Sequence, residues 1–291
     1  MTPTGRARLI VGAAELASEL ADGGVVVADA TAVFRREADG GYSISSGREG
    51  YLAEHLPGTV FADVPGDFSD PDSALEYAIP SSRRFAGRAG ALGLDPALPI
   101  VVYARESPVW ATRLWWLLRY FGYPDVRVLD GGLGAWRRAG YPVESATTRR
   151  KSVTIAVRPR PELLAHTGDV AAVVTGMPGT LVNALSAREF RGEGPAAHGR
   201  PGRIPGSVSV PSHHLLDRDT GCLLDHAALA EALGRLVDPV AAPNLIAYCG
   251  SGVTATLVIF ALAVAGREDA RLYDGSLSQW SADPGFPMET G

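Results

Sequence analysis

Residues 245–255 read LIAYCGSGVTA, and this stretch decides the fold and the chemistry that we expect of the chain. The residues before Cys249 form a short apolar run, typical of a buried strand, and an apolar run of helical length follows the loop and ends at Gly266. A thiol at the end of such a strand faces the unpaired backbone N–H groups that open the helix, and these groups stabilise an anion. Gly250 and Gly252 let the loop curl around the sulfur without a clash from a Cβ atom. A buried structural cysteine is the alternative, but the glycine loop and the helix behind it favour a nucleophile.

Composition limits the class of protein. The chain has 291 residues, of which 46% are hydrophobic and 20% charged, and its net charge of −5 is spread along the sequence. These values are typical of a soluble globular protein with two domains, and they predict neither nucleic acid nor an anionic membrane as a partner. No secretory or membrane-spanning segment is evident, and two cysteines suit a reducing compartment, so we expect a cytoplasmic protein. His, Cys and carboxylate residues do not cluster, so no metal site is expected.

The sequence repeats one order of signals. Each half has an apolar strand, a Pro-Gly turn, a strand that ends in tyrosine, and an Asp-Gly pair ahead of a tryptophan. In order, these are 25–30, 57–58, 100–103, 130–131 and Trp136 in the first half, and 181–184, 205–206, 245–248, 274–275 and Trp280 in the second. Matching order at nearly matching intervals indicates two copies of one unit.

The repeat predicts an α/β fold. Short apolar strands alternate with helical stretches such as 112–121, which favours a mostly parallel sheet with helices on both faces in each copy. We predict a first domain over residues 1–145, a linker over 146–161 that is rich in Thr, Arg and Pro, and a second domain over 162–291.

Only the second copy carries a thiol in its loop. The position that matches Cys249 in the first copy is Ala104, so the chemistry belongs to the second domain, and a ligand site between the domains follows naturally. Arg105, Trp110 and Arg113 come from the equivalent loop and helix of the first copy. Either they face this cleft, or the tryptophan packs in the core and both arginines are solvated.

These residues resemble the two-domain rhodanese-like sulfurtransferases over nearly the whole chain, from Ile10 to Glu289. The most specific match is 249–255, CGSGVTA, which is similar to the active loop of 3-mercaptopyruvate sulfurtransferases. Thiosulfate-preferring relatives carry basic residues where this chain has Gly250 and Ser251. The stretches 56–58, 204–206 and 273–276 also fit the family, and the resemblance implies tandem rhodanese-like domains.

The resemblance also implies a mechanism. A small anionic donor passes its sulfane sulfur to Cys249 as a persulfide, and a thiol or other nucleophile, which can belong to a carrier protein, takes the sulfur away. The catalytic residues would be Cys249, Ser251 and Thr254, and the loop amides that cradle the persulfide would be those of Gly250, Ser251, Gly252, Val253 and Thr254. No cofactor or metal is needed, because the cysteine carries the transferred group. Phosphatases of the related fold need an arginine six positions after the cysteine, and Ala255 there argues against phosphoryl chemistry.

The chain departs from this family around the expected substrate. An Asp-x-Arg pattern at the end of the second domain's first strand is replaced by Asn-Ala-Leu at 183–185. Glu189 stands where an arginine holds the substrate carboxylate, and a second substrate arginine falls near His198. An Asp and a His that assist the serine fall near Pro65 and Tyr77, which cannot do that work.

An ionised Glu189 would repel a carboxylate or thiosulfate. Arg188 or Arg191 would restore a positive charge through a shifted loop, with His198 as a further substrate contact; alternatively, both arginines are solvated surface residues. We expect residues 192–202, with four glycines and two prolines, to form a flexible loop.

Three functions therefore stay open. The first is a sulfurtransferase with an ordinary donor, 3-mercaptopyruvate or thiosulfate, and we favour the former. The second is a specialised biosynthetic sulfurtransferase with a non-standard donor or a carrier-protein acceptor. The third is a noncatalytic protein that keeps the fold, and the presence of Cys249 counts against it. Cys222 lies in a turn-rich segment and is expected to be structural, with a resolving or exposed thiol as the alternative.

Overall fold

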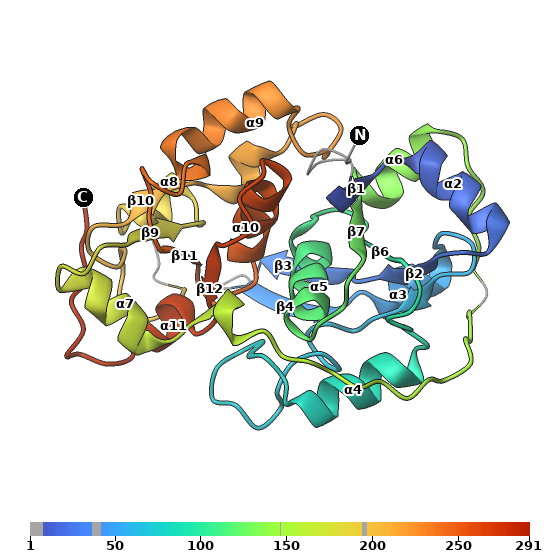
Figure 1. The fold of residues 1–291 in the computed structure, drawn as a ribbon, viewed down its shortest axis with the longest axis horizontal. Helices are drawn as coiled ribbons and strands as arrows, with labels where there is room; N and C mark the ends of the chain where they lie inside the picture. Colours follow the sequence, from blue (N-terminus) through green and yellow to red (C-terminus); the bar gives the residue numbers. More distant parts are fainter. Residues whose placement is uncertain (1–7, 37–41, 146, 194–196) are drawn as a thin grey trace.

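Two parallel sheets organise the fold, one in each half of the chain (Figure 1). The computed structural model describes residues 8–36, 42–145, 147–193 and 197–291. The strand order is β1-β7-β6-β2-β5 in the first sheet and β10-β9-β11-β12-β8 in the second, and every pairing within them is parallel. The predicted α/β class with two parallel sheets is confirmed.

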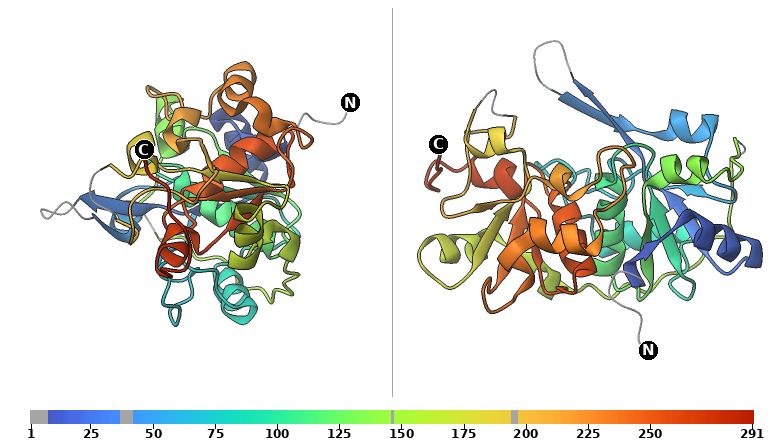
Figure 2. Two further views of the ribbon diagram at one scale, coloured as in Figure 1. Left: turned by 90° about the vertical axis from the view of Figure 1, so that its left-hand side faces the viewer. Right: turned by 90° about the horizontal axis from the view of Figure 1, so that it is seen from above.

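The first sheet is built from five short strands. They are β1 (Ile10–Val11), β2 (Val26–Asp29), β5 (Val60–Phe61), β6 (Ile100–Tyr103) and β7 (Val126–Leu129). The helices of this half are α2 (Ala13–Asp22), α3 (Arg48–Ala53), α4 (Ser82–Ala91), α5 (Val109–Tyr120) and α6 (Gly132–Arg138). An antiparallel hairpin of β3 (Ala32–Arg36) and β4 (Tyr42–Ser46) extends away from the sheet (Figure 2). This hairpin was not predicted from the sequence.

The second sheet has the same parallel character. Its strands are β8 (Leu164–Ala165), β9 (Thr180–Asn183), β10 (Val208–Ser209), β11 (Leu245–Tyr248) and β12 (Arg271–Tyr273). The α-helices are α7 (Thr167–Val174), α8 (Ala187–Phe190), α9 (His226–Leu233), α10 (Ala255–Val264) and α11 (Ser276–Trp280), and the 3₁₀ turns are η1 (Pro161–Leu163), η2 (Ser212–Leu215) and η3 (Gly234–Val237). Among the described residues, no helix is long and apolar enough to span a membrane.

Helices cover both faces of each sheet, because alternate strand residues point to opposite sides. In the first sheet Val27 packs with α2 and α6, whereas Val26 packs in the cluster that contains α4 and α5. In the second sheet Ile246 packs with α7 and α11, whereas Ala247 lies in the cluster with α9 and α10.

The two halves repeat the same closing contacts. In each, a tryptophan indole donates to a proline carbonyl, and a glutamate near the end of the unit accepts from the glycine of the Pro-Gly turn. The contacts are Trp136 Nε1 to Pro142 O (2.7 Å) and Trp280 Nε1 to Pro287 O (2.9 Å), then Gly58 N to Glu144 Oε2 and Gly206 N to Glu289 Oε2 (both 3.1 Å). The motifs that revealed the repeat are therefore those that fasten the ends of each unit to its sheet.

The predicted linker follows the surface of the first domain. Residues 147–160 contain no helix or strand, and Val153, Arg158 and Arg160 donate backbone hydrogen bonds to carbonyls at the ends of α4 and α5. Residues 1–7 of the predicted first domain, and residue 146 at the start of the predicted linker, lie outside the described part of the chain. The domain boundaries stay predictions.

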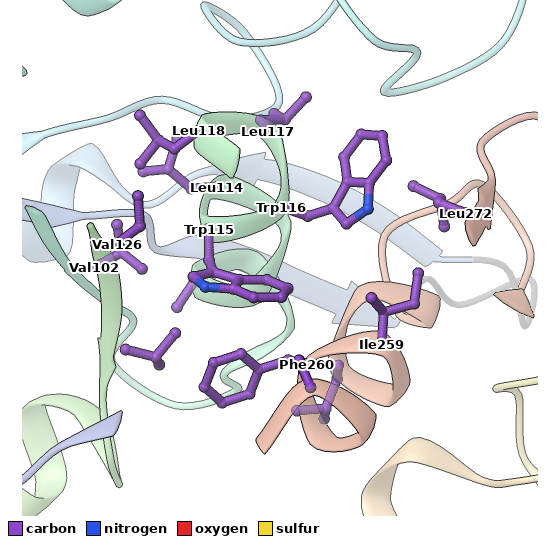
Figure 3. Packing of buried hydrophobic residues seen from close by; sticks show 14 of the residues in the cluster. Val102, Leu114, Trp115, Trp116, Leu117, Leu118, Val126, Ile259, Phe260 and Leu272 are labelled. Atoms are coloured by element: carbon purple, nitrogen blue, oxygen red, sulfur yellow. The ribbon is translucent and has the colours of Figure 1, made fainter. Parts of the chain in front are cut away.

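Helices α5 and α10 join the two halves. All ten residues of α10 and ten of the twelve in α5 are buried, in keeping with sequences that are apolar on nearly every face. Trp115 packs edge-to-face on Phe260 with ring centroids 4.9 Å apart, and Trp116 points toward Leu272 (Figure 3). The Thr112 and Thr256 hydroxyls lie 3.0 Å apart. The helix that follows the Cys249 loop is thus packed directly on the first domain.

Candidate active site

Cys249 follows β11 directly and is 1% exposed. Its backbone N–H donates to Ser276 Oγ at 3.1 Å, and its carbonyl accepts from Leu277 N at 3.1 Å. Ser276 is itself buried, has φ of +48°, and its hydroxyl donates a hydrogen bond to Tyr273 O at 2.8 Å. The turn between β12 and α11 therefore fixes the cysteine backbone from the neighbouring strand, ahead of the first turn of α10.

A glycine shapes the middle of the loop. Gly252 has φ of +76°, and an added Cβ would lie 2.5 Å from the carbonyl oxygen of Asp274. Any side chain at this position meets both backbone strain and a backbone atom. The loop can therefore lie this close to the β12–α11 turn only with glycine at position 252.

Arg113 of the first domain holds this loop from outside. Its side chain is completely buried, and Nη1 donates to Gly252 O at 3.2 Å and to Asp274 Oδ1 at 2.7 Å. Nη2 donates to Tyr77 O at 2.6 Å. Neither alternative from the sequence describes this residue, because Arg113 does not line the cavity and is not solvated. It positions the loop of the other domain.

A cavity of about 520 Å³ opens beside Cys249, between the two domains. The second domain lines it with Cys249, Ser251 and Thr254 among others, and the first domain contributes Trp110, which is 4% exposed. The predicted catalytic residues therefore share one wall. Arg105 is not among the lining residues, because its guanidinium pairs with Glu54 at 2.9 Å.

His198 lies against the Cys249 loop. A Cβ atom on Gly250 would come within 2.0 Å of the imidazole Nε2, so the ring rests on the α-carbon of that glycine. Burial lowers the pKa of His198, although Glu189 and Glu76 act in the opposite direction. His198 lines the cavity as a neutral imidazole near neutral pH, and the sequence prediction of a residue near the substrate is compatible with this position.

Glu189 also lines the cavity. It is the third residue of α8 and closes a capping box, since its Oε2 accepts from Ser186 N at 3.1 Å and from Ser186 Oγ at 2.5 Å. The carboxylate is thereby fixed at the position where the family resemblance led us to expect a cation.

The two predicted substrate arginines lie elsewhere. Arg188 is exposed and does not line the cavity, and Arg191 is exposed and forms two hydrogen bonds with Glu193, at 2.7 and 3.0 Å. The expectation that one of them restores the missing positive charge is therefore not met by the described structure. Residues 194–196 of the predicted flexible loop lie outside the described residues.

Asn183 forms in the second domain the turn contact that Asp29 forms in the first. Its Oδ1 accepts from Leu185 N at 2.8 Å, just as Asp29 Oδ1 in the first domain accepts from Thr31 N at 2.8 Å. An amide serves this turn as well as a carboxylate does. Leu185 lines the cavity where the family pattern has an arginine.

Two further features were not predicted. Tyr77 lines the cavity and packs edge-to-face on Trp110, with ring centroids 5.2 Å apart, and Ser276 supports the cysteine backbone. The Tyr-Asp-Gly-Ser stretch signalled Ser276 without revealing its partner. Cys222 is half-buried and does not line the cavity; its neighbour Leu223 donates to Asp130 Oδ1 of the first domain at 2.8 Å. Among the residues that the structure describes, no cluster of three or more His, Cys, Asp or Glu residues is arranged to hold a metal.

Comparisons with known proteins place the chain among sulfurtransferases of one family. A family model described as "Rhodanese-like domain" matches residues 12–139 and 176–283. The putative thiosulfate sulfurtransferase SseB of Mycobacterium tuberculosis is 34% identical over 249 residues, which are 84% of this chain and 86% of that protein. The 3-mercaptopyruvate sulfurtransferase of Escherichia coli K12 is 32% identical over 282 residues, 96% of this chain and 97% of its own. The crystal structure of SseA from Escherichia coli superposes with a TM-score of 0.81 at 30% identity and covers 92% of this chain and 98% of that one.

Proposed function

The chain belongs to the rhodanese-like family and is a tandem-domain sulfurtransferase, and we propose that Cys249 carries the sulfur as a persulfide. The observation that supports this most directly is the position of Cys249 at the end of β11, in a cavity wall that also contains Ser251 and Thr254. Ala104 occupies the equivalent place in the first domain, so sulfur transfer is a property of the second domain alone.

The proposed loading step needs no cofactor. The Cys249 thiolate attacks the sulfur of 3-mercaptopyruvate, the carbon–sulfur bond breaks, and its electron pair leaves as the enolate of pyruvate, which then takes a proton. Cys249 is left with one extra sulfur. The amides of residues 250–254 lie at the amino end of α10, where an anion is stabilised, and the Ser251 and Thr254 hydroxyls donate to the persulfide or to the departing enolate oxygen.

Charge favours 3-mercaptopyruvate over thiosulfate as the donor. The cavity contains Glu106 and Glu189, and none of its described lining residues is a lysine or an arginine. Repulsion grows with the charge of the donor, so a dianion is disfavoured more strongly than a monoanion. His198 then contributes to substrate binding as a neutral hydrogen-bonding group, without Arg188 or Arg191.

The natural acceptor is proposed to be a thiol, either a small molecule or a thiol presented by a carrier protein. A specialised biosynthetic role is the second candidate, and the observation that favours it is that no arginine is found among the described residues that line the cavity. Both cysteines are free thiols, which suits a cytoplasmic enzyme.

Intact-mass spectrometry tests the carrier assignment. After incubation with 3-mercaptopyruvate and removal of the donor, we expect a mass increase of one sulfur atom in the wild type and in Cys222→Ser. Cys249→Ser should show none. A sulfur adduct that persists in Cys249→Ser would refute the assignment, and an adduct with thiosulfate but none with 3-mercaptopyruvate would overturn the donor preference.

A further inference from the structure

The cavity beside Cys249 is acidic. Glu106 faces it from the first domain and Glu189 from the second. Within the described part of the chain, no lysine or arginine lines it. Its two histidines do not offset these carboxylates, because burial lowers the pKa of both His198 and His213 and keeps them neutral near pH 7.

The field of Glu189 reaches across the cavity. This carboxylate raises the pKa of both His198 and His213 against the effect of burial, and Glu76 adds to it at His198. Arg218 acts on His213 in the opposite direction but does not line the cavity.

Three arginines near the site pair with carboxylates: Arg113 with Asp274, Arg105 with Glu54, and Arg191 with Glu193. Arg188 is exposed and Arg200 donates to backbone carbonyls, and neither lines the cavity. The negative charge at Glu189 and Glu106 is therefore not cancelled by a lining partner.

An aromatic wall completes the cavity. Trp110 and Tyr77 meet edge-to-face at 87°, and burial raises the pKa of Tyr77 to about 12, so its ring stays uncharged. The faces of such rings attract ammonium groups, more strongly where the contact is shielded from water. Carboxylates and aromatic rings together are the chemistry that recognises an organic cation.

We infer that this cavity selects an acceptor thiol that carries an ammonium group, which binds near Glu189 and Glu106 and beside the Tyr77–Trp110 pair. The inference rests on the proposed function. The acceptor sulfur bonds to the outer sulfur of the Cys249 persulfide, the bond between that sulfur and Cys249 breaks, and its electron pair returns to Cys249 as a thiolate. The acceptor attacks as its thiolate and the proton on the outer sulfur moves with that sulfur, so the products are the acceptor persulfide R–S–SH and the Cys249 thiolate, and no oxidant or reductant is required.

Discharge of a preformed persulfide tests this inference. The enzyme is loaded with 3-mercaptopyruvate, or with inorganic polysulfide if that donor fails, and freed of the donor. It is then mixed with cysteamine, 2-mercaptoethanol or 3-mercaptopropionate, and loss of the extra sulfur mass gives the rate, corrected for each thiol's ionised fraction. We expect cysteamine to be fastest and 3-mercaptopropionate slowest. Equal rates, or a preference for the carboxylate, would overturn the inference while leaving the carrier assignment intact.

Charge variants identify the source of the preference. A carboxylate at roughly 6 Å from the charged end of the acceptor, in a water-like dielectric, attracts the ammonium group of cysteamine and repels the carboxylate of 3-mercaptopropionate. Together these two effects change the ratio of the two discharge rates by roughly tenfold. Glu189→Gln should lower the cysteamine-to-mercaptopropionate ratio by about that factor, and Glu106→Gln by less, because Glu106 is more exposed. Glu231→Gln, on the exposed side of α9, is the matched control and should leave the ratio unchanged. A ratio that does not change in Glu189→Gln refutes the role of this residue.

A second readout does not depend on sulfur transfer. In a Cys222→Ser background, methanethiosulfonate reagents with an aminoethyl or a sulfonatoethyl tail modify Cys249 from within the cavity. The aminoethyl reagent should react faster, and Glu189→Gln should reduce its advantage by about tenfold. If this selectivity is present but no persulfide forms, the carrier assignment is refuted. If a persulfide forms without the selectivity, the cationic acceptor is refuted.

Discussion

Replacing Arg113 tests whether the first domain holds the sulfur-carrying loop of the second. The guanidinium is fully buried on α5 and joins Gly252 O, Asp274 Oδ1 and Tyr77 O. Methionine keeps much of the side-chain volume but removes all three hydrogen bonds and leaves the carboxylate of Asp274 without its ion pair. The loop carbonyl of Gly252 then has no donor from the first domain.

The size of the effect follows from burial. Loss of one partner from a buried ion pair destabilises a protein by about 3–5 kcal/mol. The lower end applies here, because the Asp274 side chain is 14% exposed and Ile79 N still donates to Oδ2 at 2.9 Å. We therefore expect Arg113→Met to lower the free energy of unfolding by about 3 kcal/mol and the melting temperature by roughly 6–12 °C. The rate of persulfide formation should fall by about tenfold or more, since the loop loses its position.

A double-mutant cycle measures the pair itself. Urea unfolding of Arg113→Met, Asp274→Asn and the double variant should give a coupling energy of about 1.5–3 kcal/mol, because the double variant no longer buries an unpaired charge. Arg113→Lys should lie between wild type and Arg113→Met, since an ammonium cannot reach the three acceptors as the planar fork does. If Arg113→Met lies within about 1 kcal/mol of wild type, as for a surface pair, and loads sulfur at the normal rate, the reasoning is refuted.

Three further predictions concern the residues around Cys249. Gly252→Ala should lower the free energy of unfolding by at least about 2 kcal/mol, because it adds a clash with a backbone atom to the strain at φ +76°. The control Gly23→Ala, at φ +69° with open space around it, should lower the free energy of unfolding by only about 1 kcal/mol. Equal losses of the two variants in urea titrations would contradict the clash. Ser276→Ala and Ser276→Gly both remove the hydroxyl that accepts from Cys249 N, but only glycine relieves the strain at φ +48°. Ser276→Ala should therefore be about 1 kcal/mol less stable than Ser276→Gly in the same assay. Identical stabilities would show that the strain is absent. Burial lowers the pKa of His198 below its usual value near 6.5, so the unfolded chain binds more protons than the folded chain below that pH. The contribution of His198 to the free energy of unfolding should be constant above pH 6.5. It should decline as the pH falls from 6.5 to the lowered pKa, by at most about 1.4 kcal/mol per pH unit. His198→Gln should reduce this slope without abolishing it, because His213 shifts in the same direction, and a slope equal to the wild type's would exclude His198 as its source.

The fold could be predicted from the sequence because the residues of the repeated motifs also form the hydrogen bonds that close each domain. The indoles of Trp136 and Trp280 and the carboxylates of Glu144 and Glu289 form the same backbone contacts in each half, so their order and spacing report the topology directly. Cys249 was accessible for a similar reason, since strand, loop and helix are contiguous around it.

The residues around the expected substrate were harder to predict, because one of their contacts is made within a single helical turn and another joins segments far apart in the sequence. The Ser-x-x-Glu spacing from Ser186 to Glu189 is a capping box, and it fixes Glu189 at the third position of α8 while Arg188 remains exposed. This spacing is readable from the sequence alone. The contact of His198 with Gly250, by contrast, joins segments about fifty positions apart and has no sequence signature.

The hairpin β3–β4 carried a readable signal as well. Two short runs flank the sequence Asp-Gly-Gly at 39–41, which is a typical hairpin pattern. The role of Arg113 had no such signal. An arginine within an apolar helix can face solvent, a ligand or a distant loop, and only the packing of α5 on α10 decides among them.

Only the second domain carries the thiol, but the two domains share a hydrophobic interface that each needs to bury its own apolar helix. Helix α10 is apolar on nearly every face and all ten of its residues are buried, so without α5 the surface around Phe260 would be exposed to water. The loop ahead of α10 would also lose the Arg113 contact at Gly252, and the cavity would lose Glu106 and Trp110. The first domain, whose Ala104 cannot carry sulfur, therefore serves both as half of the core and as the wall that selects what reaches Cys249.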